Sequence, residues 1–430
     1  MGMGGVQRTA KFVKYLPDYG WKPFVLTVAP KQYLASDECL LRDVDNGHTR
    51  IFRTGVIITK EGNGRTKVVE FKTDNRRKFL SHVLQAFLIP DSKALWKHKA
   101  LELAAKIIKG NNIELVYATA PPYTDFLIAK ELKKTFGLPV VLDYRDSWID
   151  CPNNFYATPL HKNIHVKMET SALKAANKVV TINSRIKELI REKYPFKAEE
   201  DFVIIPQGFD SEDFNVKDWL AKKNKMRFTY AGSFMNYYSP KYFLEGLSLL
   251  FKARPELKDK IEASFLGSFP NEYKSLIDEY RLSEAVNLLG YVEHSECVKY
   301  ELSSDVLWMM INKTERSDLH STGKLYEYFG AGKPILACVP DGVAKKSLMN
   351  YNAVKICEPD DSGAIAKAIG EYYDLYTSGK MPVPDNDVIN KYDRQKLTGK
   401  LAGVFEDVLI KTQTDETAVP GEDKINLAHT

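Results

Sequence analysis

The feature that most constrains the fold of this sequence is an alternation of short apolar runs with amphipathic stretches. The runs are rich in β-branched and aromatic residues and have the length of strands buried on both faces, about four to eight residues. In the first half of the chain the expected strands are 23–29, 50–54, 115–120, 139–146, 178–183 and 202–207. Helical patterns fall between most of them, for example at 124–136 and 162–176. Such alternation predicts parallel sheets in α/β domains.

A second alternating series begins after a break near 209–225. Its expected strands are 227–233, 261–268, 286–292, 306–312, 334–340 and 353–358. Two series predict two doubly wound, Rossmann-like domains that face each other across a cleft, with the first spanning 1–208 and the second 209–390. The polar segment 413–430 lacks an apolar face and is expected to be disordered.

Composition and charge exclude several classes of protein. The 430 residues are 44% hydrophobic and 27% charged, an ordinary globular composition. The net charge of +5 is too small to indicate a nucleic-acid partner. The five cysteines show no C-x-x-C spacing, which argues against a zinc site and for a reducing compartment. No apolar run reaches the ~18–20 residues of a membrane span and no signal peptide is visible, so we expect a cytoplasmic location.

One segment, 75–90, places a basic cluster beside apolar residues in "NRRKFLSHVLQAFLIP". A helix that is basic at one end and apolar along one face fits two interpretations. It can be a core-packed helix with a solvated basic end, which we favour, or a peripheral contact with the inner face of the cell membrane.

The stretch 320–339, "HSTGKLYEYFGAGKPILACV", predicts a short helix followed by a buried strand. Ser321 or Thr322 can cap the helix, and Gly332 ends it. One side of the helix carries only small side chains and a single carboxylate: Gly323, Glu327, Gly330 and Ala331. The N–H groups at the helix start suit a phosphate, and Glu327 suits sugar hydroxyls. The alternative is an ordinary amphipathic helix whose Lys324 and Glu327 are solvated.

Polar residues gather where the expected strands end, and ligands bind beyond the carboxyl ends of parallel strands. "PPYTDF" follows 115–120, "DYRDSW" follows 139–142 and "GSFMNYYSPK" follows 229–231. An Arg145–Asp salt bridge that closes the sheet is the structural alternative for the second of these. Gly4 and Gly5 open a helix expected at 6–19 and can bring backbone N–H groups to a phosphate.

Six pieces of the chain carry a resemblance to a known family. They are "GGVQRTAKFVKYLPDYGWKPFVLTV" (4–28), "YATAPPYTDFLIAKELKKTFGLPVVLDYRDSW" (117–148), "VIIPQGFDSEDF" (203–214), "FTYAGSF" (228–234), "LGYVEHSE" (289–296) and "GKLYEYFGAGKPILA" (323–337). In this order they resemble bacterial family 4 glycosyltransferases of GT-B architecture, of the type that builds lipopolysaccharide, capsule and exopolysaccharide.

The resemblance implies a retaining glycosyltransferase of cell-surface polysaccharide biosynthesis. A nucleotide-sugar donor would bind mainly to the second domain and a glycan or lipid-linked acceptor to the first, with a crossover helix at about 391–412. The expected donor-binding residues are Gly4, Gly5, Gly232, Ser233, Lys241, Thr322, Gly323, Lys324 and Glu327, with Glu327 on the ribose. The expected catalytic residues are Asp146, Arg145 and His320, and the expected acceptor-binding residues are Asp143, Trp148 and Tyr123. No metal or other cofactor is required, and the acidic strings 43–45 and 385–387 are taken as solvated.

The chain departs from the family pattern at three places. Leu319 stands where the family usually has a second glutamate, and Lys241 alone represents the usual Arg and Lys after the first strand of the second domain. A non-catalytic homologue that binds nucleotide sugar or glycan, or a nucleotide-sugar epimerase, therefore stays open. The family also has a buried strand directly before the glycine turn, and only residues 1–3 precede Gly4. We therefore expect the first strand to be missing and the first domain to be poorly stable.

Overall fold

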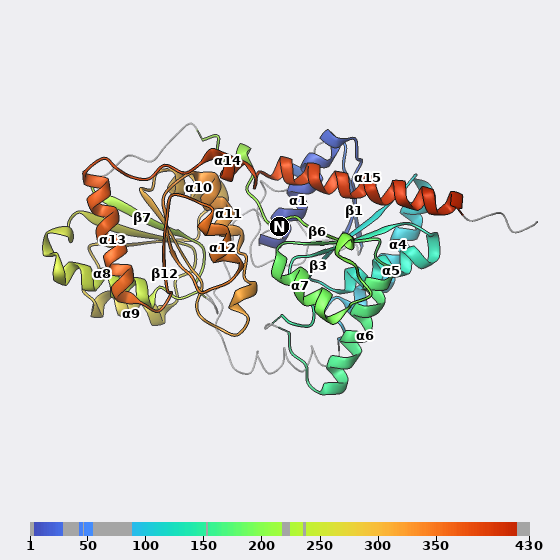
Figure 1. Cartoon of the computed structure of the whole chain (residues 1–430), viewed down its shortest axis with the longest axis horizontal. Helices are drawn as coiled ribbons and strands as arrows, with labels where there is room; N and C mark the ends of the chain where they lie inside the picture. Colours follow the sequence, from blue (N-terminus) through green and yellow to red (C-terminus); the bar gives the residue numbers. More distant parts are fainter. Residues whose placement is uncertain are drawn as a thin grey trace, which may run out of the picture.

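The computed structural model describes residues 4–28, 43–45, 47–54, 88–151, 154–216, 224–234 and 238–418. These residues form two α/β domains side by side (Figure 1). Each strand expected from the sequence is present, with ends that differ by a few residues, and every strand pairing is parallel. The expected fold class is therefore confirmed.

The strands of the first domain form two hydrogen-bonded groups, β1–β2 and β3–β4–β5–β6. Their bounds are β1 Phe24–Val28, β2 Arg50–Thr54, β3 Val116–Ala120, β4 Val140–Tyr144, β5 Lys178–Thr181 and β6 Phe202–Ile204. Among the described residues no strand pairs with the second edge of β1 or with that of β3. In the second domain the first strand, β7, lies between β8 and β10. The equivalent place in the first domain is between β1 and β3. Residues 1–3 lie outside the described residues, so the missing strand stays a prediction.

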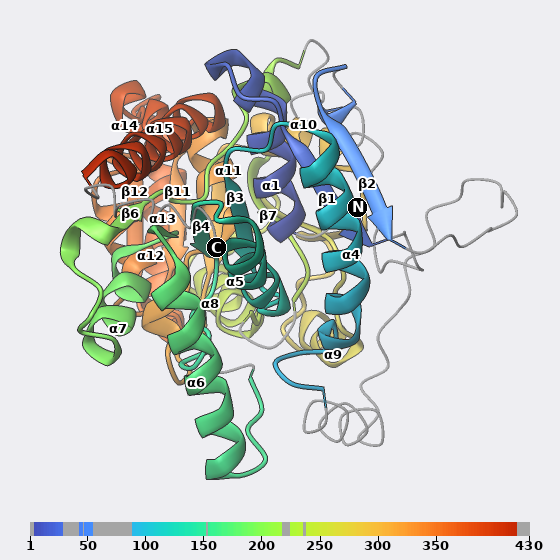
Figure 2. The same cartoon turned by 90° about the vertical axis from the view of Figure 1, so that its right-hand side faces the viewer.

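The helices of the first domain lie against these strands (Figure 2). Their bounds are α1 Gly4–Tyr15, η1 Leu16–Tyr19, η2 Ala94–Trp96, α4 Lys97–Gly110, α5 Thr124–Phe136, α6 Pro159–Ala175, α7 Ser184–Lys193 and η3 Glu199–Asp201. The expectation of one helix to residue 19 was wrong. Pro17 has no N–H to donate, and the α-helix gives way to the 3₁₀ turn η1. Helix α6 starts before the expected residue 162 because Thr158 caps it and Pro159 suits its first turn.

The second domain has one six-stranded sheet of order β12-β11-β10-β7-β8-β9. Its first strand, β7, is central, as in a doubly wound sheet. The strands are β7 Met226–Ala231, β8 Ile261–Leu266, β9 Val286–Gly290, β10 Val306–Met310, β11 Ile335–Cys338 and β12 Val354–Cys357. The helices are α8 Lys241–Ala253, η5 Pro255–Leu257, α9 Asn271–Glu279, α10 His294–Leu302, η6 Ser317–Leu319, α11 Gly323–Ala331, α12 Val343–Met349, α13 Ser362–Thr377 and α14 Asn386–Asn390.

Two segments connect the domains and run beside each other. The outgoing segment contains η4 (Ser211–Phe214), and the returning one leads into α15 (Arg394–Ala418). Phe209 and Asp393 form a parallel β-bridge between the two segments. Helix α15 then lies along the first domain (Figure 1), where Leu397, Leu401 and Phe405 share a core with Phe12 and Leu16 of the α1 region. The helix continues past the expected boundary near 412, and residues 419–430 lie outside the described part.

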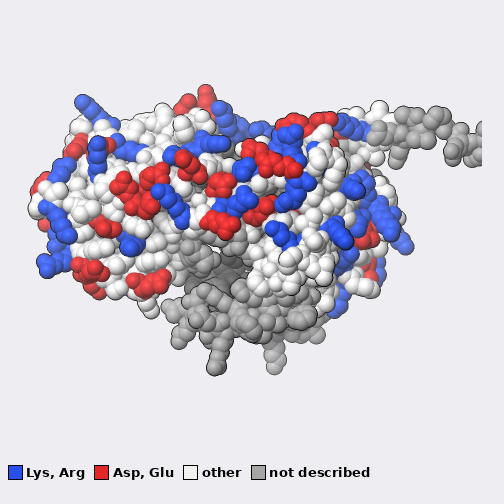
Figure 3. Space-filling model, turned by 60° about the horizontal axis from the view of Figure 1, so that its bottom comes forward, with Lys and Arg blue, Asp and Glu red and all other residues white. Residues whose placement is uncertain are grey.

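The surface carries both signs of charge. On the face in Figure 3, Lys and Arg lie among Asp and Glu without a large field of one sign. Within the described ranges, no helix is both long and apolar enough to cross a bilayer. Residues 75–87 fall outside these ranges, so neither interpretation of the basic segment is tested.

Candidate active site

A cavity of about 340 Å³ opens between the two domains. The first domain lines it with the loops that follow β3, β4 and β5, and the second with the turn before α11. Its walls include Arg145, Asp146 and Ile186 on one side and Leu319, His320 and Thr322 on the other. The three residues expected to be catalytic and one expected to bind the donor thus line the same cavity.

Asp146 and His320 come from opposite domains and influence each other's protonation. Asp146 is exposed to the cavity, and the protein atoms around it raise its pKa, against the opposing charges of Arg145 and His320. Burial lowers the pKa of His320, against the opposing charges of Asp146 and Asp318. The carboxyl group therefore holds a proton more readily than usual and the imidazole less readily.

Arg145 is fixed at the carboxyl end of β3. Its Nε lies 3.4 Å from the carbonyl oxygen of Ala120, and its Nη2 donates to the carbonyl of Pro121. The backbone N–H of Arg145 also donates to the carbonyl oxygen of Ala120, at a distance of 3.0 Å. This anchoring holds the guanidinium beside Asp146 at the wall of the cavity.

Helix α11 begins with a capped turn that faces open space. The side chain of Thr322 accepts a hydrogen bond from the N–H of Lys324 at 3.1 Å, as the sequence predicts. A Cβ on Gly323 would meet no atom within 4 Å. Gly332 ends the helix in the left-handed region, with φ of 61°. The start of α11 therefore offers backbone N–H groups and the positive end of a helix dipole to a ligand.

Lys324 is a cation enclosed by aromatic rings. Its Nζ donates to the hydroxyl of Tyr230 at 3.1 Å and lies 4.4 Å and 4.9 Å from the ring centroids of Tyr230 and Tyr238. Among the described residues no carboxylate forms an ion pair with it. Burial lowers its pKa to about 8, with Glu327 the main opposing charge. A half-buried ammonium that forms no ion pair is costly unless a ligand supplies an anion.

One glycine turn lies directly against this lysine, and a second glycine turn packs on the first. Gly232, after β7, has φ of 140°, and a Cβ there would lie 2.0 Å from the Nζ of Lys324. Gly267, after β8, has φ of 109°, and a Cβ there would lie 2.6 Å from the backbone of Gly232. The hydroxyl of Ser233 accepts from the N–H of Ser268 at 3.0 Å and ties the two turns together. Glycine at both positions lets the backbone and Lys324 come close to each other.

Glu327 lies one turn further along α11 and pairs with His294 of α10. The His294 Nε2 to Glu327 Oε1 distance is 3.2 Å, and the side chains are 23% and 22% exposed. Burial lowers the pKa of His294, but Glu327 more than offsets this and raises it to about 9. Burial correspondingly raises the pKa of Glu327, and His294 more than offsets that, so the net shift is downward. The pair is therefore ionised at neutral pH.

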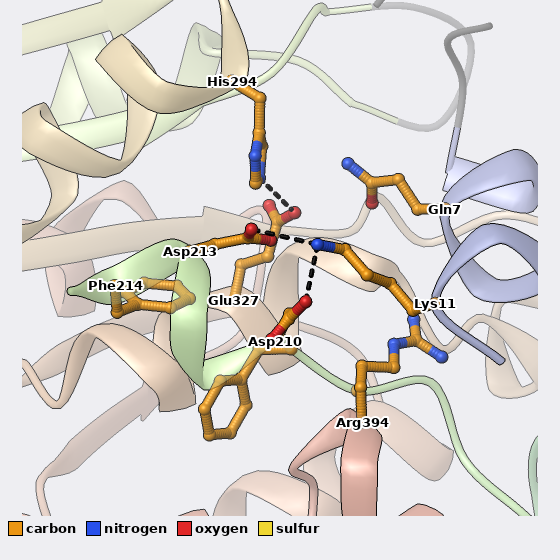
Figure 4. Close-up of a pocket in the computed structure, with 10 residues that line it drawn as sticks. Gln7, Lys11, Asp210, Asp213, Phe214, His294, Glu327 and Arg394 are labelled. Atoms are coloured by element: carbon orange, nitrogen blue, oxygen red, sulfur yellow. Dashed lines mark hydrogen bonds and ion pairs between the residues drawn. The ribbon is translucent and has the colours of Figure 1, made fainter. Parts of the chain in front are cut away.

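Glu327 also borders a small polar cavity where both domains and both connecting segments meet (Figure 4). Lys11 of α1 reaches across to Asp210 and Asp213 of the outgoing segment, at 2.6 and 2.9 Å. Arg394 lies at the start of α15 and donates through Nη2 to Gln207 at 3.1 Å. Asp43, taken as solvated from the sequence, instead pairs with Lys11 at 2.8 Å. This junction joins the domains through charge as well as through backbone.

The side of α11 that looked bare in the sequence is only partly open. A Cβ on Gly330 would lie 2.5 Å from the ring of Phe209 and 2.9 Å from that of Phe214. Gly330 is therefore small because the connecting segment packs against it, which corrects the expectation that this whole side faces a ligand. Gly323 and Glu327 remain the accessible part of that side.

The three residues expected to bind the acceptor are buried below the cavity. Asp143 forms a bidentate pair with Arg8 at 2.9 and 3.0 Å and accepts from Tyr117 and Thr119. Trp148 donates to His165 at 3.1 Å and stacks on Tyr123, whose hydroxyl donates to the carbonyl of Ser147 at 2.8 Å. These contacts support the loop that carries Arg145 and Asp146, and they do not place the three side chains in the cavity.

The remaining expected residues lie at helix starts. Gly4 and Gly5 form the first turn of α1. Lys241 is exposed at the first position of α8, with its ammonium 5.3 Å from the ring centroid of Tyr242. In the described part of the chain, no three His, Cys, Asp or Glu side chains are grouped so that they could hold a metal ion.

Some residues of this site are missed by reasoning from the sequence. His294 follows β9 in "LGYVEHSE", so its place after a strand was an available signal. Tyr230 and Gly267 gave no such signal, because an aromatic in a buried strand and a glycine at a strand end are common in cores and turns. Arg8 also gave none, because its partner Asp143 is far away in the sequence.

Comparisons with known proteins give a structural answer only. Neither a family model nor a curated protein matches the sequence. A glycosyltransferase from Rickettsia africae ESF-5 is similar in structure, with a TM-score of 0.61 at 16% identity over 95% of this chain and 96% of that one.

Two further structures agree with it. WaaG, a glycosyltransferase involved in lipopolysaccharide biosynthesis, gives a TM-score of 0.56 at 13% identity over 94% of this chain and 97% of that one. Anabaena Alr3699/HepE in complex with UDP-glucose gives 0.56 at 13% identity over 96% and 97%. Identities this low show the fold alone, and the chain has the two-domain α/β fold of these glycosyltransferase structures.

Proposed function

We propose that this chain is a retaining glycosyltransferase. It moves a sugar from a nucleotide-sugar donor to a hydroxyl group of a glycan or lipid-linked acceptor. The observation that carries this proposal is the enclosed ammonium of Lys324, which lies at the open start of α11 against Gly232 and has no carboxylate partner among the described residues. A diphosphate would supply the missing negative charge and would accept from the N–H groups of the first turn.

The same arrangement suits the chemistry of sugar transfer. Negative charge grows on the diphosphate as the glycosidic bond breaks, and Lys324 and the α11 dipole stabilise it. Thr322 and Gly323 place the N–H groups, and Glu327 accepts from the ribose hydroxyls one turn away. Gly4 and Gly5 of α1, together with Gly232, Ser233 and Lys241, complete the proposed donor-binding set. In this proposal no metal is needed at the leaving group.

The acceptor would enter the cavity between the domains. Asp146 or His320 would take the proton of its hydroxyl group, and the positive charge of Arg145 would stabilise the ionised form of Asp146. Asp143, Trp148 and Tyr123 support this loop from below. The likeness in fold to WaaG favours cell-surface polysaccharide biosynthesis, which would place the reaction in the cytoplasm at the inner face of the membrane.

A non-catalytic homologue is the second candidate, and Leu319 favours it. This side chain is 9% exposed and packs into the core of the first domain, where the resemblance implies a carboxylate near the sugar. Such a protein would bind the donor and show no turnover.

Calorimetry with a panel of nucleoside diphosphates, followed by transfer assays with the matching sugars, tests the proposal. Glu327→Ala should weaken nucleotide binding by about 2–4 kcal/mol, because hydrogen bonds to a charged group contribute roughly 1.5–3 kcal/mol each. That is about 30- to 1,000-fold in Kd. The matched control is Glu296→Ala on neighbouring α10, whose carboxylate pairs with Lys299.

The outcomes separate the candidates. Binding without transfer to any acceptor would favour the non-catalytic protein. Equal affinity for nucleoside diphosphate in the Glu327→Ala and Glu296→Ala variants would contradict the proposed donor site.

A further inference from the structure

The turn η6 of the second domain is docked on the first domain. The carboxylate of Asp318 accepts from the Nε of Arg185 at 3.0 Å. The carbonyl of Leu319 accepts from the Nδ2 of Asn183 at 3.2 Å. Asn183 is also the N-cap of α7, since its side chain accepts from the N–H of Ile186 at 2.9 Å. Both donors therefore sit on the rigid start of one helix.

An apolar contact completes this docking. The side chain of Leu319 belongs to the buried core of the first domain, together with Ile182 just before α7 and Ile186 within it. His320 follows directly and lines the cavity. Leu319 therefore holds the chain at the point where His320 must face Asp146.

The backbone of this segment is shaped for the docked position. Arg316 precedes η6 with φ of 61°, a conformation that costs energy for a residue with a side chain. Its guanidinium lies 3.8 Å from the carboxylate of Asp150 in the first domain. From the other side, Gly342 approaches so closely that a Cβ would lie 2.7 Å from the Cα of Asp318. The segment is thus fixed between α12 and α7.

We infer that Asn183 and Arg185 are positioning residues for the transfer reaction. They act through η6, and they set the distance between His320 and Asp146 when the domains face each other. The inference rests on the proposed function, because it assigns these two residues a part in that reaction. In the described part of the chain, the hydrogen bonds that Asn183 and Arg185 donate to the second domain go to η6 and not to the proposed donor-binding residues of α11, so their loss should affect turnover and not donor binding.

The test compares Arg185→Ala, Asp318→Ala and the double variant. Each single change should lower kcat by roughly ten- to a hundredfold, because small displacements of reacting groups have effects of this size. The KM for the donor should stay unchanged, and Arg185→Lys should recover part of the loss. The double variant should be no slower than the slower single variant, because both changes break one contact.

Two controls make the test specific. Arg191→Ala removes a charge from the same helix α7, but the partner of Arg191 is Glu199 in the same domain. The charge of Asp318 also raises the pKa of His320, so its loss can shift the pH–rate profile. The rates of all variants are therefore compared on the plateau of each profile. Arg185→Ala also loses contacts with Glu188 and Glu192, which Asp318→Ala leaves in place.

Three results would each overturn the inference. The kcat of Arg185→Ala could be unchanged, the effects of the two single changes could multiply in the double variant, or the loss could be confined to the KM for the donor. Amide hydrogen exchange measures how firmly η6 is held on α7, and it does not depend on turnover. If the wild-type protein shows no transfer, the proposed function fails, but the contact between η6 and α7 can still be tested. Arg185→Ala should then speed exchange at 317–322 relative to Arg191→Ala. Equal exchange in the two variants would show that α7 does not hold η6.

Discussion

Asp143 near the end of β4 and Asp146 in the loop that follows are close in sequence, yet their surroundings give them different chemistry. Burial raises the pKa of Asp143, but the Arg8 guanidinium and the hydroxyls of Tyr117 and Thr119 more than offset this and lower it. Asp146 faces the cavity and its pKa is raised. The sequence showed two carboxylates at a strand end. It could not show which one meets Arg8, because that partner is distant in the chain and only the packed helix α1 brings it there.

This contrast predicts opposite phenotypes for two matched variants. Asp146→Asn should reduce kcat by about 10²–10⁴-fold, the usual range for loss of an acid–base group, with the melting temperature and donor affinity unchanged. Arg145→Ala should act in the same direction. Asp143→Asn should instead cost about 3–5 kcal/mol of stability, because it leaves Arg8 buried without its anion. Thermal melts and steady-state kinetics on the three proteins decide. A stable Asp143→Asn protein with lost turnover would reverse the two roles.

Lys324 predicts a pH dependence of donor binding. In the free protein its pKa is about 8, because burial disfavours the charged form. A bound diphosphate would raise that pKa, so a proton must be taken up on binding above pH 8 and none is taken up well below it. The Kd should therefore rise by up to about tenfold per pH unit above 8. Calorimetry at several pH values in two buffers measures this uptake. Lys324→Met should bind weakly and without the slope, and a flat wild-type profile would contradict the assignment.

At the scale of elements, the sequence predicted the features that depend on neighbouring residues, such as where a helix begins and ends. The start and end of α11 follow from Thr322 and Gly332, and its boundaries were foreseen for that reason. The sequence also showed that one side of α11 is small. It could not show that Phe209 and Phe214 cover the Gly330 end, because they belong to a connecting segment more than a hundred residues earlier. A helical pattern reveals a face, but what covers that face depends on tertiary packing.

At the scale of the whole molecule, the site depends on how the two domains are held together. The connecting segments join through the Phe209–Asp393 bridge, Lys11 pairs with Asp210 and Asp213, and η6 docks on α7. Each contact links residues far apart in the chain, so no periodic pattern in the sequence predicts it. The two-domain fold was predictable from alternating strands and helices, whereas the geometry of the cleft between the domains was not.

Gly208 gives the sharpest test of this junction. A Cβ there would lie 2.4 Å from the carbonyl oxygen of Tyr392 and 2.6 Å from the Cδ1 of Leu397. Gly208→Ala must therefore push the two connecting segments apart. It would strain the hydrogen bonds from Phe209 N to Tyr392 O, at 3.1 Å, and from Arg394 N to Phe209 O, at 2.8 Å. Overpacking of this kind typically costs about 1–3 kcal/mol.

The matched control is Gly403→Ala in α15, the helix whose first turns Gly208 contacts, because a Cβ on Gly403 meets no atom within 4 Å. It should be neutral or stabilising by up to about 1 kcal/mol, since alanine favours a helix over glycine. Gly208→Ala should melt at a lower temperature than Gly403→Ala and exchange its amides faster at 392–397. Its kcat should fall as well, because the cavity between Asp146 and His320 exists only when the domains are held in register. Equal melting temperatures and equal exchange in the two variants would show that the connecting segments can accommodate a methyl group at residue 208. The geometry of the cleft would then depend on other contacts between the domains.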